Sequence, residues 1–227
     1  MLAAAIRAVF FDAVGTLIVP DPPVAEAYAA AGRRHGCDLP LESVTRRFRD
    51  AFRGEAQKDA IHGGVTSEER ERQRWQTIVA AVFEHCPEMD SVFNELYAHF
   101  ARPEAWRVTD GAGEMLAELL KRGLTLGLAS NFDCRLNPIV DGLPELSIIK
   151  CRVISSAIGW LKPSPRFFEA VIRSAGCAAS EILFVGDDRM NDFTGARAAG
   201  MQAVLFDSRP DEIPGIKRIR RLSELLE

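Results

Sequence analysis

The sequence predicts an α/β protein whose parallel-sheet core is interrupted by a long all-helical insertion. Two sequence patterns within the 227 residues lead to this prediction. After Trp106, short apolar runs alternate with helical segments, an order typical of a parallel sheet covered on both faces. Between Val24 and about Ala105 the spacing is helical, and no run has the character of a strand. The length suits one main domain that carries a sizeable insertion.

The first expected strand is the apolar run from Ile6 to Asp12, which ends at an acidic residue. The segment Pro20–Pro23 then disfavours helix and indicates a connection into the insertion. The wider apolar opening, Leu2 to Val19, is broken by Arg7 and lacks a basic leader with a cleavage site. We therefore expect a buried strand here and no signal peptide.

In the insertion, Val44, Phe48 and Phe52 recur at helical spacing, with arginines on the other side. The run Thr66-Ser67-Glu68-Glu69 resembles a capping box that opens a further helix. Six basic residues could meet an anionic substrate, but we interpret them as a solvated helix face: Arg33, Arg34, His35, Arg46, Arg47 and Arg53. Trp75 and Trp106 are interpreted as packing residues.

After Trp106 we expect a helix from Gly113 to Lys121 and then a series of strands. The strand-like runs are Leu124–Ser130, Arg152–Ser155, Glu181–Gly186 and Gln202–Phe206. Parallel sheets bind ligands at the carboxyl ends of their strands. Asp12, Ser130 and Asp187 are expected at three such ends.

The composition narrows the function class. A net charge of −4, from 28 basic and 32 acidic residues, argues against a nucleic-acid partner. No segment has the length and apolarity of a membrane span, so we expect no membrane partner. The five scattered cysteines form no C-x-x-C pair, which indicates reduced thiols in a cytoplasmic protein. The four histidines show no zinc-ligand spacing.

Chemically active residues follow one another along the chain in a suggestive order. They are Asp12, Ser130-Asn131, Lys162 and the acidic run that contains Asp187, Asp188 and Asp192. Singly, each has an ordinary interpretation as a helix cap, a surface lysine or a polar turn. Together they supply what phosphoryl transfer needs: a carboxylate to attack phosphorus, donors for the phosphoryl oxygens, a lysine to offset charge, and acids to hold Mg²⁺.

This ordered set resembles the haloacid dehalogenase-like (HAD) hydrolase superfamily. The segment Asp12–Leu17 matches its first motif, Ser130 the second, Lys162-Pro163 the third and Gly186–Asp192 the fourth. The helical block falls where many members carry a cap. The run Ser130–Asp133 is most similar to the branch named for a rhythmically expressed insect gene. The resemblance implies a Rossmann-like core of residues 1–18 and 107–227, with a helical cap domain of residues 19–106.

The resemblance also implies the roles of individual residues. Asp12 is the expected nucleophile and a metal ligand, and the Val14 carbonyl and the Asp187 carboxylate complete the protein ligands of Mg²⁺. The residues expected to hold the phosphoryl oxygens are Thr16, Ser130 and Asn131, and Lys162 offsets charge. Asp188 and Asp192 are expected to support the metal, with direct ligation by either left open. The implied substrate is a small phosphorylated metabolite, and the sequence sets neither its identity nor the oligomeric state.

One position departs from the phosphatase pattern. Phosphatases of this superfamily place an acid/base aspartate two residues after the nucleophile, where this chain has Val14. A positioned acid or base contributes ~10²–10⁴-fold, so turnover of poor leaving groups should be weak. Three functions remain open: a magnesium-dependent phosphohydrolase, a phosphate-ligand- or partner-binding protein with little catalysis, and a dehalogenase or phosphonate hydrolase. Asp187 and Asp192 disfavour the last.

Overall fold

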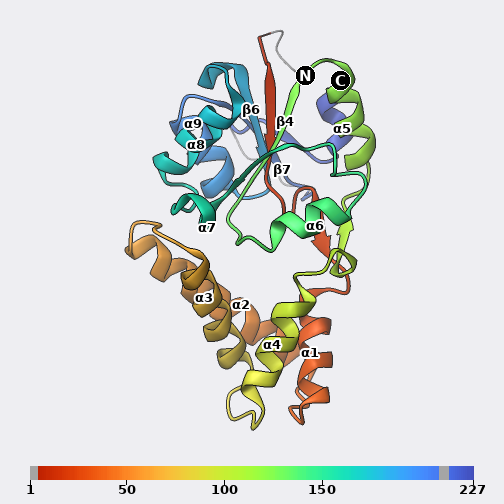
Figure 1. The fold of residues 1–227 in the computed structure, drawn as a ribbon, viewed down its shortest axis with the longest axis vertical. Coiled ribbons are helices and arrows are strands. Elements are labelled where there is room, and N and C mark those ends of the chain that lie inside the picture. The colour runs from red at the N-terminus through yellow and green to blue at the C-terminus, as the bar shows by residue number, and fades with distance from the viewer. Residues whose placement is uncertain (1–4, 210–214) are drawn as a thin grey trace.

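A six-stranded parallel sheet forms the centre of one half of the molecule in the computed structural model, which describes residues 5–209 and 215–227 (Figure 1). In spatial order the strands are β5 (Cys151–Ile154), β4 (Thr125–Ser130), β1 (Ala8–Phe11), β6 (Ile182–Gly186), β7 (Gln202–Phe206) and β8 (Arg218–Ile219). The first five lie where the apolar runs predict them. The two-residue β8 is too short to leave a recognisable pattern.

Strand β1 shows how the sheet is buried on both faces. Val9 and Phe11 point into one hydrophobic core, Ala8 and Phe10 point into another, and all four are fully buried. The first core includes α5 (Ala112–Lys121) and α6 (Leu136–Gly142), and the second includes α8 (Pro165–Ala175) and α9 (Gly195–Ala198). A continuous apolar strand therefore fits a parallel sheet between two layers of helices, as the sequence predicts.

The connection between β5 and α8 carries the short helix α7 (Ser155–Ile158). Helix α8 begins with Pro165 in its first turn, and its last residue is followed by Gly176, which adopts φ +66°. Proline is favoured at the start of a helix, and glycine is favoured where the end requires a left-handed residue.

In residues 5–209 and 215–227, no helix combines the length and apolarity needed to cross a bilayer.

Four helices build the other half of the molecule: α1 (Val24–Arg34), α2 (Leu41–Ile61), α3 (Glu68–Val82) and α4 (Met89–His99) (Figure 1). The structure describes every residue from Val24 to His99, and all the elements in this range are helices, as predicted. Its apolar faces meet around Tyr28, Phe83 and Phe93, and the Tyr28 ring stacks on Phe83 with centroids 6.1 Å apart. The helical cap thus has a hydrophobic interior of its own.

A two-stranded antiparallel ribbon links the two halves. It pairs β2 (Ile18–Pro20) with β3 (Trp106–Val108), so the chain leaves and re-enters the core side by side. The sequence does not predict this ribbon because three residues are too few to establish a periodicity. We propose that the boundaries between core and cap, at residues 18/19 and 106/107, lie within it.

The expectation that all five cysteines are free thiols is wrong for one pair. Cys37, after α1, and Cys86, after α3, form a disulfide with Cα atoms 5.8 Å apart. The free cysteines of the described chain are Cys134, Cys151 and Cys177. The paired cysteines are separated by 49 positions, and only the packing of the cap helices brings them together. Spacing along the sequence carries no sign of that contact.

The start of α3 differs in detail from the predicted capping box. The helix begins at Glu68, and the hydroxyl of Ser67 accepts a hydrogen bond from the Arg70 amide at 3.1 Å. Thr66 instead donates to the Glu71 carboxylate at 2.6 Å. The predicted boundary is therefore correct, but a single serine caps the helix and Thr66 belongs to a buried polar cluster.

Candidate active site

Three predicted site residues lie at the carboxyl ends of neighbouring strands. Asp12 follows β1, Ser130 ends β4 and Asp187 follows β6, and β1 pairs with both of the other strands. Because these strands are parallel, the three residues share one edge of the sheet, which faces the cap (Figure 1). All three line a cavity of about 740 Å³ between core and cap.

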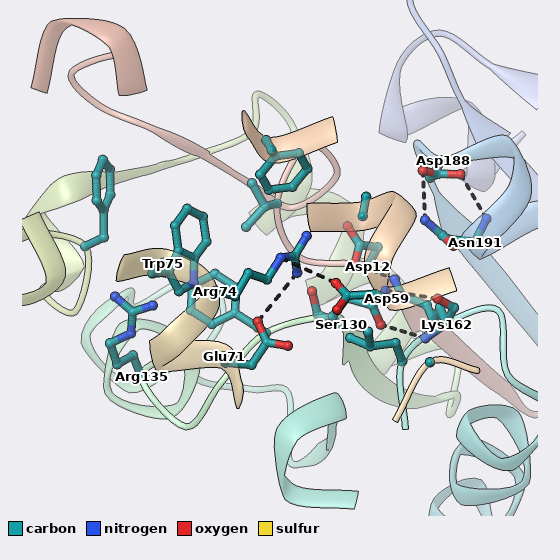
Figure 2. Close-up of a pocket in the computed structure, with 18 of the residues that line it drawn as sticks. Asp12, Asp59, Glu71, Arg74, Trp75, Ser130, Arg135, Lys162, Asp188 and Asn191 are labelled. Atoms are coloured by element: carbon teal, nitrogen blue, oxygen red, sulfur yellow. Dashed lines mark hydrogen bonds and ion pairs between the residues drawn. The ribbon is translucent and has the colours of Figure 1, made fainter. Parts of the chain in front are cut away.

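Lys162 joins two carboxylates at the centre of the site (Figure 2). Its ammonium group donates to Asp12 Oδ1 at 2.6 Å, to Asp192 Oδ1 at 2.6 Å and to the Ala129 carbonyl at 3.2 Å. Burial alone would lower the pKa of Lys162, but the charges of Asp12 and Asp192 raise that pKa above its ordinary value. The lysine therefore stays charged and holds one oxygen of Asp12 in place.

A reciprocal contact with Asn131 fixes the backbone of Lys162. The Lys162 amide donates to Asn131 Oδ1 at 2.7 Å, and Asn131 Nδ2 donates to the Lys162 carbonyl at 3.2 Å. Asn131 also lines the cavity, and its Nδ2 carries a second hydrogen beyond this bond. Asn131 therefore positions the lysine, a role that the sequence does not predict.

Three carboxylates converge beside this lysine. One oxygen from each of Asp12, Asp187 and Asp192 lies within 4.8 Å of the other two. When all are ionised, their three negative charges exceed the single ammonium charge by two, an excess that a divalent cation balances. The donor atoms are all hard oxygens, the ligands that Mg²⁺ prefers. The residues present thus fit a magnesium site.

Two glycines allow the acids to approach one another. Gly15 has φ +92°, and a Cβ atom at this position would lie 2.5 Å from Asp187 Oδ2. A Cβ atom on Gly186 would overlap the Asp192 carboxylate. Larger residues would therefore push these carboxylates out of the cluster, and Gly15 also requires a backbone conformation that other residues rarely adopt.

The pKa values of two acids reflect this crowding. The pKa of Asp187 is raised to about 7, first because the surrounding protein displaces water from its carboxyl group and then because the charges of Asp12 and Asp192 oppose its ionisation. The residue nevertheless lines the cavity. Burial also raises the pKa of Asp192, against the opposing charge of Lys162. A cation bound between these groups would favour their ionised forms.

Thr16 and Asp188 occupy positions that differ from those expected. Thr16 is fully buried, does not line the cavity, and donates from its hydroxyl to Asp187 Oδ1 at 3.3 Å. The structure therefore does not support the predicted phosphate contact through this hydroxyl. Asp188 lines the cavity but caps the helical turn Arg189–Thr194, accepting from the Met190 amide at 2.8 Å. It lies outside the group of converging carboxylates.

Val14 lines the same cavity as Asp12, and its side chain packs against the hydrophobic core of the sheet. Its side chain offers neither a hydrogen-bond donor nor an acidic group to the cavity. Its backbone carbonyl is still present and can act as an oxygen ligand.

The cap contributes charged residues that the sequence analysis does not single out. Asp59 of α2 and both Glu71 and Arg74 of α3 line the cavity, and each is more than nine-tenths buried. Figure 2 shows Arg74 directed toward Asp59 and Glu71. Helical spacing offered a signal, because Glu71 and Arg74 share the buried face of α3 with Ile78.

The six basic residues assigned to a solvated face do not line the cavity, whereas two tryptophans do. His35, for example, contacts Glu88 at 3.0 Å and Glu95 at 2.8 Å. Trp75 and Trp106, interpreted as packing residues, do pack against neighbouring rings, but they also form part of the cavity wall.

Comparisons with known proteins agree with this architecture. The family model for haloacid dehalogenase-like hydrolases matches residues 6–200. The chain is 35% identical over 208 residues to the human haloacid dehalogenase-like hydrolase domain-containing protein 3, covering 88% of this chain and 81% of that protein.

Solved structures share the fold at low sequence identity. A dehalogenase superposes with a TM-score of 0.75 at 18% identity, covering 99% of this chain and 97% of that one. YfnB from Bacillus subtilis, solved bound to magnesium, superposes with a TM-score of 0.73 at 19% identity, covering 97% and 96%. These likenesses concern the fold, and the assignment to one branch of the superfamily stays a prediction. Because the family model spans most of the sequence, the chain belongs to the haloacid dehalogenase-like hydrolase family.

Proposed function

We propose that this hydrolase is a magnesium-dependent phosphohydrolase that acts on a small phosphorylated metabolite through an aspartyl-phosphate on Asp12. The observation that carries the proposal is the convergence of Asp12, Asp187 and Asp192 around the ammonium group of Lys162. This cluster suits a divalent cation, which in turn attracts a phosphate group.

Asp12 is placed to act as the nucleophile. Its Oδ1 accepts from Lys162, whereas no hydrogen bond within the described chain reaches its Oδ2. In the first step Oδ2 forms a bond to phosphorus, and the bond from phosphorus to the leaving oxygen breaks with the electron pair on that oxygen. Water then attacks the same phosphorus, breaks its bond to Asp12 and releases inorganic phosphate.

Ser130 and Asn131 are the proposed donors to the phosphoryl oxygens. The Ser130 hydroxyl lines the cavity and makes no hydrogen bond within the described chain. Asn131 keeps its second Nδ2 hydrogen for a ligand. Lys162 offsets charge on Asp12 and on the phosphoryl group, and its fixed position needs no rearrangement during the reaction.

Mg²⁺ would be held by the carboxylates of Asp12 and Asp187 and by the Val14 carbonyl. When bound, the ion supplies charge neutralisation between the carboxylates and the phosphoryl group. Asp192 supports these ligands because both of its oxygens are already occupied, one by Lys162 at 2.6 Å and the other by the Asp188 amide at 2.9 Å. Asp188, which caps a helical turn, stabilises the loop that carries Asp187 and Asp192.

Val14 restricts the substrates of such a site. A departing alkoxide needs a proton donor, and its absence at this position should slow the step by ~10²–10⁴-fold. An aryl or acyl phosphate leaves as a stabler anion and needs the donor less. The proposed hydrolase therefore favours good leaving groups.

Val14 also supports a second candidate, a phosphate-ligand- or partner-binding protein with little catalysis. A dehalogenase or phosphonate hydrolase is disfavoured. Without a cation, the excess negative charge of Asp12, Asp187 and Asp192 would repel an anionic haloacid.

Release of inorganic phosphate from an aryl phosphate, with and without Mg²⁺, tests the proposal. Wild type should show slow release that depends on Mg²⁺, and Asp12→Asn should abolish it. Asp110→Asn, the same change at an acid whose side chain is 97% exposed, should have no effect. Binding of phosphate without turnover would favour the second candidate, and halide release from a haloacid would favour dehalogenation.

A further inference from the structure

The cap side of the cavity is an aromatic wall, which the proposed phosphoryl chemistry does not require. The rings that line it include Tyr28, Phe48, Phe52, Trp75, Phe93 and Tyr97. Trp75 and Phe52 lie with centroids 6.2 Å apart, and Phe48 stacks on Phe52 at 5.9 Å. Since the phosphoryl group belongs at Asp12, this wall faces the rest of the substrate, and a flat apolar group fits such a surface.

Arg74 is a charged residue of this wall with unused hydrogen-bonding capacity. It is only 7% exposed and lies with its guanidinium carbon 5.0 Å from the Phe52 ring centroid. No hydrogen bond within the described chain reaches its guanidinium group. Its nearest carboxylate oxygens, on Asp59 and Glu71, are 3.6 Å and 3.5 Å away.

The unpaired atoms of this pair face each other. Arg74 Nε and Asp59 Oδ2 are both buried and lack a hydrogen-bond partner, and they are the two atoms separated by 3.6 Å. A buried donor and acceptor without partners are costly to leave unsatisfied. Both side chains line the cavity, where a ligand group that accepts from the remaining N–H groups of the Arg74 guanidinium and donates to the Asp59 carboxylate would complete the cluster.

The other members of the same polar cluster already have partners. Arg70 donates to Glu55 at 3.0 Å and to Asp59 Oδ1 at 2.7 Å, and Thr66 donates to Glu71 at 2.6 Å. Arg70, which does not line the cavity, therefore supplies the hydrogen bonds that hold the Glu55 and Asp59 carboxylates in this cluster.

Arg135, the second buried guanidinium on the cavity wall, is also satisfied. It donates to Asp133 Oδ1 at 2.8 Å, to Asp133 Oδ2 at 2.7 Å and to the Tyr97 carbonyl at 3.2 Å. Its guanidinium lies 3.7 Å from the Tyr97 ring centroid. Arg135 thus holds the wall together, which leaves Arg74 as the guanidinium available to a ligand.

We infer that Arg74 and Asp59 form a specificity site for the leaving group, and that the substrates are phosphate esters of planar aromatic alcohols with a neutral hydrogen-bonding substituent. The inference rests on the proposed function, which it deepens. Arg74 donates to the substituent and Asp59 accepts from it, while the aromatic wall contacts the ring. A phenolic leaving group is also the kind that needs no acid at Val14, so both ends of the cavity favour the same class of substrate.

The charge of the cluster explains why the substituent is neutral. Three carboxylates, those of Glu55, Asp59 and Glu71, face three cations, those of Lys58, Arg70 and Arg74. An anionic substituent would meet the Asp59 carboxylate without a compensating excess of positive charge. A carboxamide or hydroxyl makes both hydrogen bonds at no such cost.

Binding of leaving-group alcohols, which needs neither phosphate nor Mg²⁺, tests the inference. The probes are meta-hydroxybenzamide, its apolar analogue meta-isopropylphenol and the charged meta-hydroxybenzoate. Tryptophan fluorescence can follow binding because Trp75 and Trp106 line the cavity. Wild type should bind the carboxamide about tenfold more tightly than either of the others, the effect expected of one or two buried hydrogen bonds.

Arg74→Gln should reduce this preference to within about twofold. Arg72→Gln, on the same helix with its guanidinium over the Phe93 and Tyr97 rings and outside the cavity wall, should retain it. If thermal melting shows that Arg74→Gln does not fold, Arg74→Lys decides, because lysine keeps the charge but lacks the planar set of guanidinium donors and should lose most of the preference. An unchanged preference in the folded Arg74 variant, no preference in wild type, or tightest binding of the benzoate would each overturn the inference.

The experiments can reject the phosphohydrolase and the specificity site independently of each other. A preference that depends on Arg74, without any phosphate release from aryl phosphates, would reject the phosphohydrolase and keep the specificity site. Phosphate release that depends on Asp12, without the preference, would reject the specificity site and keep the hydrolase.

Discussion

The buried cations on the core side and on the cap side of the cavity differ in how fully they are hydrogen-bonded. On the core side, Lys162 makes hydrogen bonds of 2.6 Å to two carboxylates, and its backbone is clamped by Asn131. On the cap side, Arg74 has only ion pairs of about 3.5 Å and no hydrogen bond within the described chain. The difference separates a lysine whose hydrogen bonds are already made within the protein from an arginine whose hydrogen bonds a ligand can complete.

Removal of the central ammonium should give the largest effect on the core side. Lys162→Met leaves Asp12 and Asp192 without their counter-ion, and breaking such a buried pair costs ~3–5 kcal/mol. Urea unfolding without Mg²⁺ measures this loss, and added Mg²⁺ should restore part of it. Lys150→Met, at an exposed lysine, is the control. Equal stability of the two variants would show that the carboxylates do not depend on Lys162.

Magnesium should give the next largest effect, and its size should depend on pH. At a concentration 100-fold above its dissociation constant, a ligand of the native state stabilises by ~2.7 kcal/mol. The pKa of Asp187 is raised to about 7, so its contribution to the stability of the metal-free protein is present at low pH and is lost as pH rises through 7. Mg²⁺ requires the ionised form, so calorimetry should show a larger Mg²⁺ gain at pH 8 than at pH 6.

Asp187→Asn should remove most of this Mg²⁺ gain together with its pH dependence. Asp188→Asn, a neighbouring change at a residue that caps a helical turn, should keep both. The same Mg²⁺ response in the Asp187 variant as in wild type would exclude this residue as a ligand.

The smallest expected effect concerns one of the contacts between the cap and the core. Glu68, at the start of α3, accepts from the Cys134 amide at 3.0 Å and from the Ser156 hydroxyl of α7. Ser156→Ala removes one of these bonds and should lower the free energy of unfolding by about 1 kcal/mol. Ser147→Ala, whose hydroxyl bonds only locally to the Pro144 carbonyl, is the control. A loss no greater than in the control would mean that this contact does not hold the cap against the core.

The core side was predictable from sequence because its signals are local and ordered. Asp12 and Asp187 each follow an apolar strand directly, and the topology of parallel strands then brings them to one edge. What these motifs do not reveal is how side chains are used once packed. Asn131 clamps Lys162 and Thr16 turns toward Asp187, and both contacts join segments far apart in the chain.

The cap side was not predictable to the same degree. Helical spacing predicts helices there, but it does not say which buried positions face the cavity and which face the interior of the cap. Arg74 looks like one more arginine in a charged helix, and only the packing of α2 against α3 pairs it with Asp59. The Cys37–Cys86 disulfide escaped prediction for the same reason.

The value of kcat/KM for an aryl and an alkyl phosphate, measured in wild type and Val14→Asp with saturating Mg²⁺, tests the account most directly. Wild type should hydrolyse the aryl phosphate slowly and the alkyl phosphate scarcely at all. Val14→Asp should supply the missing acid and raise alkyl turnover more than aryl turnover, by up to ~10²–10⁴-fold. Vigorous alkyl turnover by wild type, or no gain in a Val14→Asp protein that folds and binds Mg²⁺, would contradict the claim that Val14 limits a phosphoryl-transfer site built on Asp12.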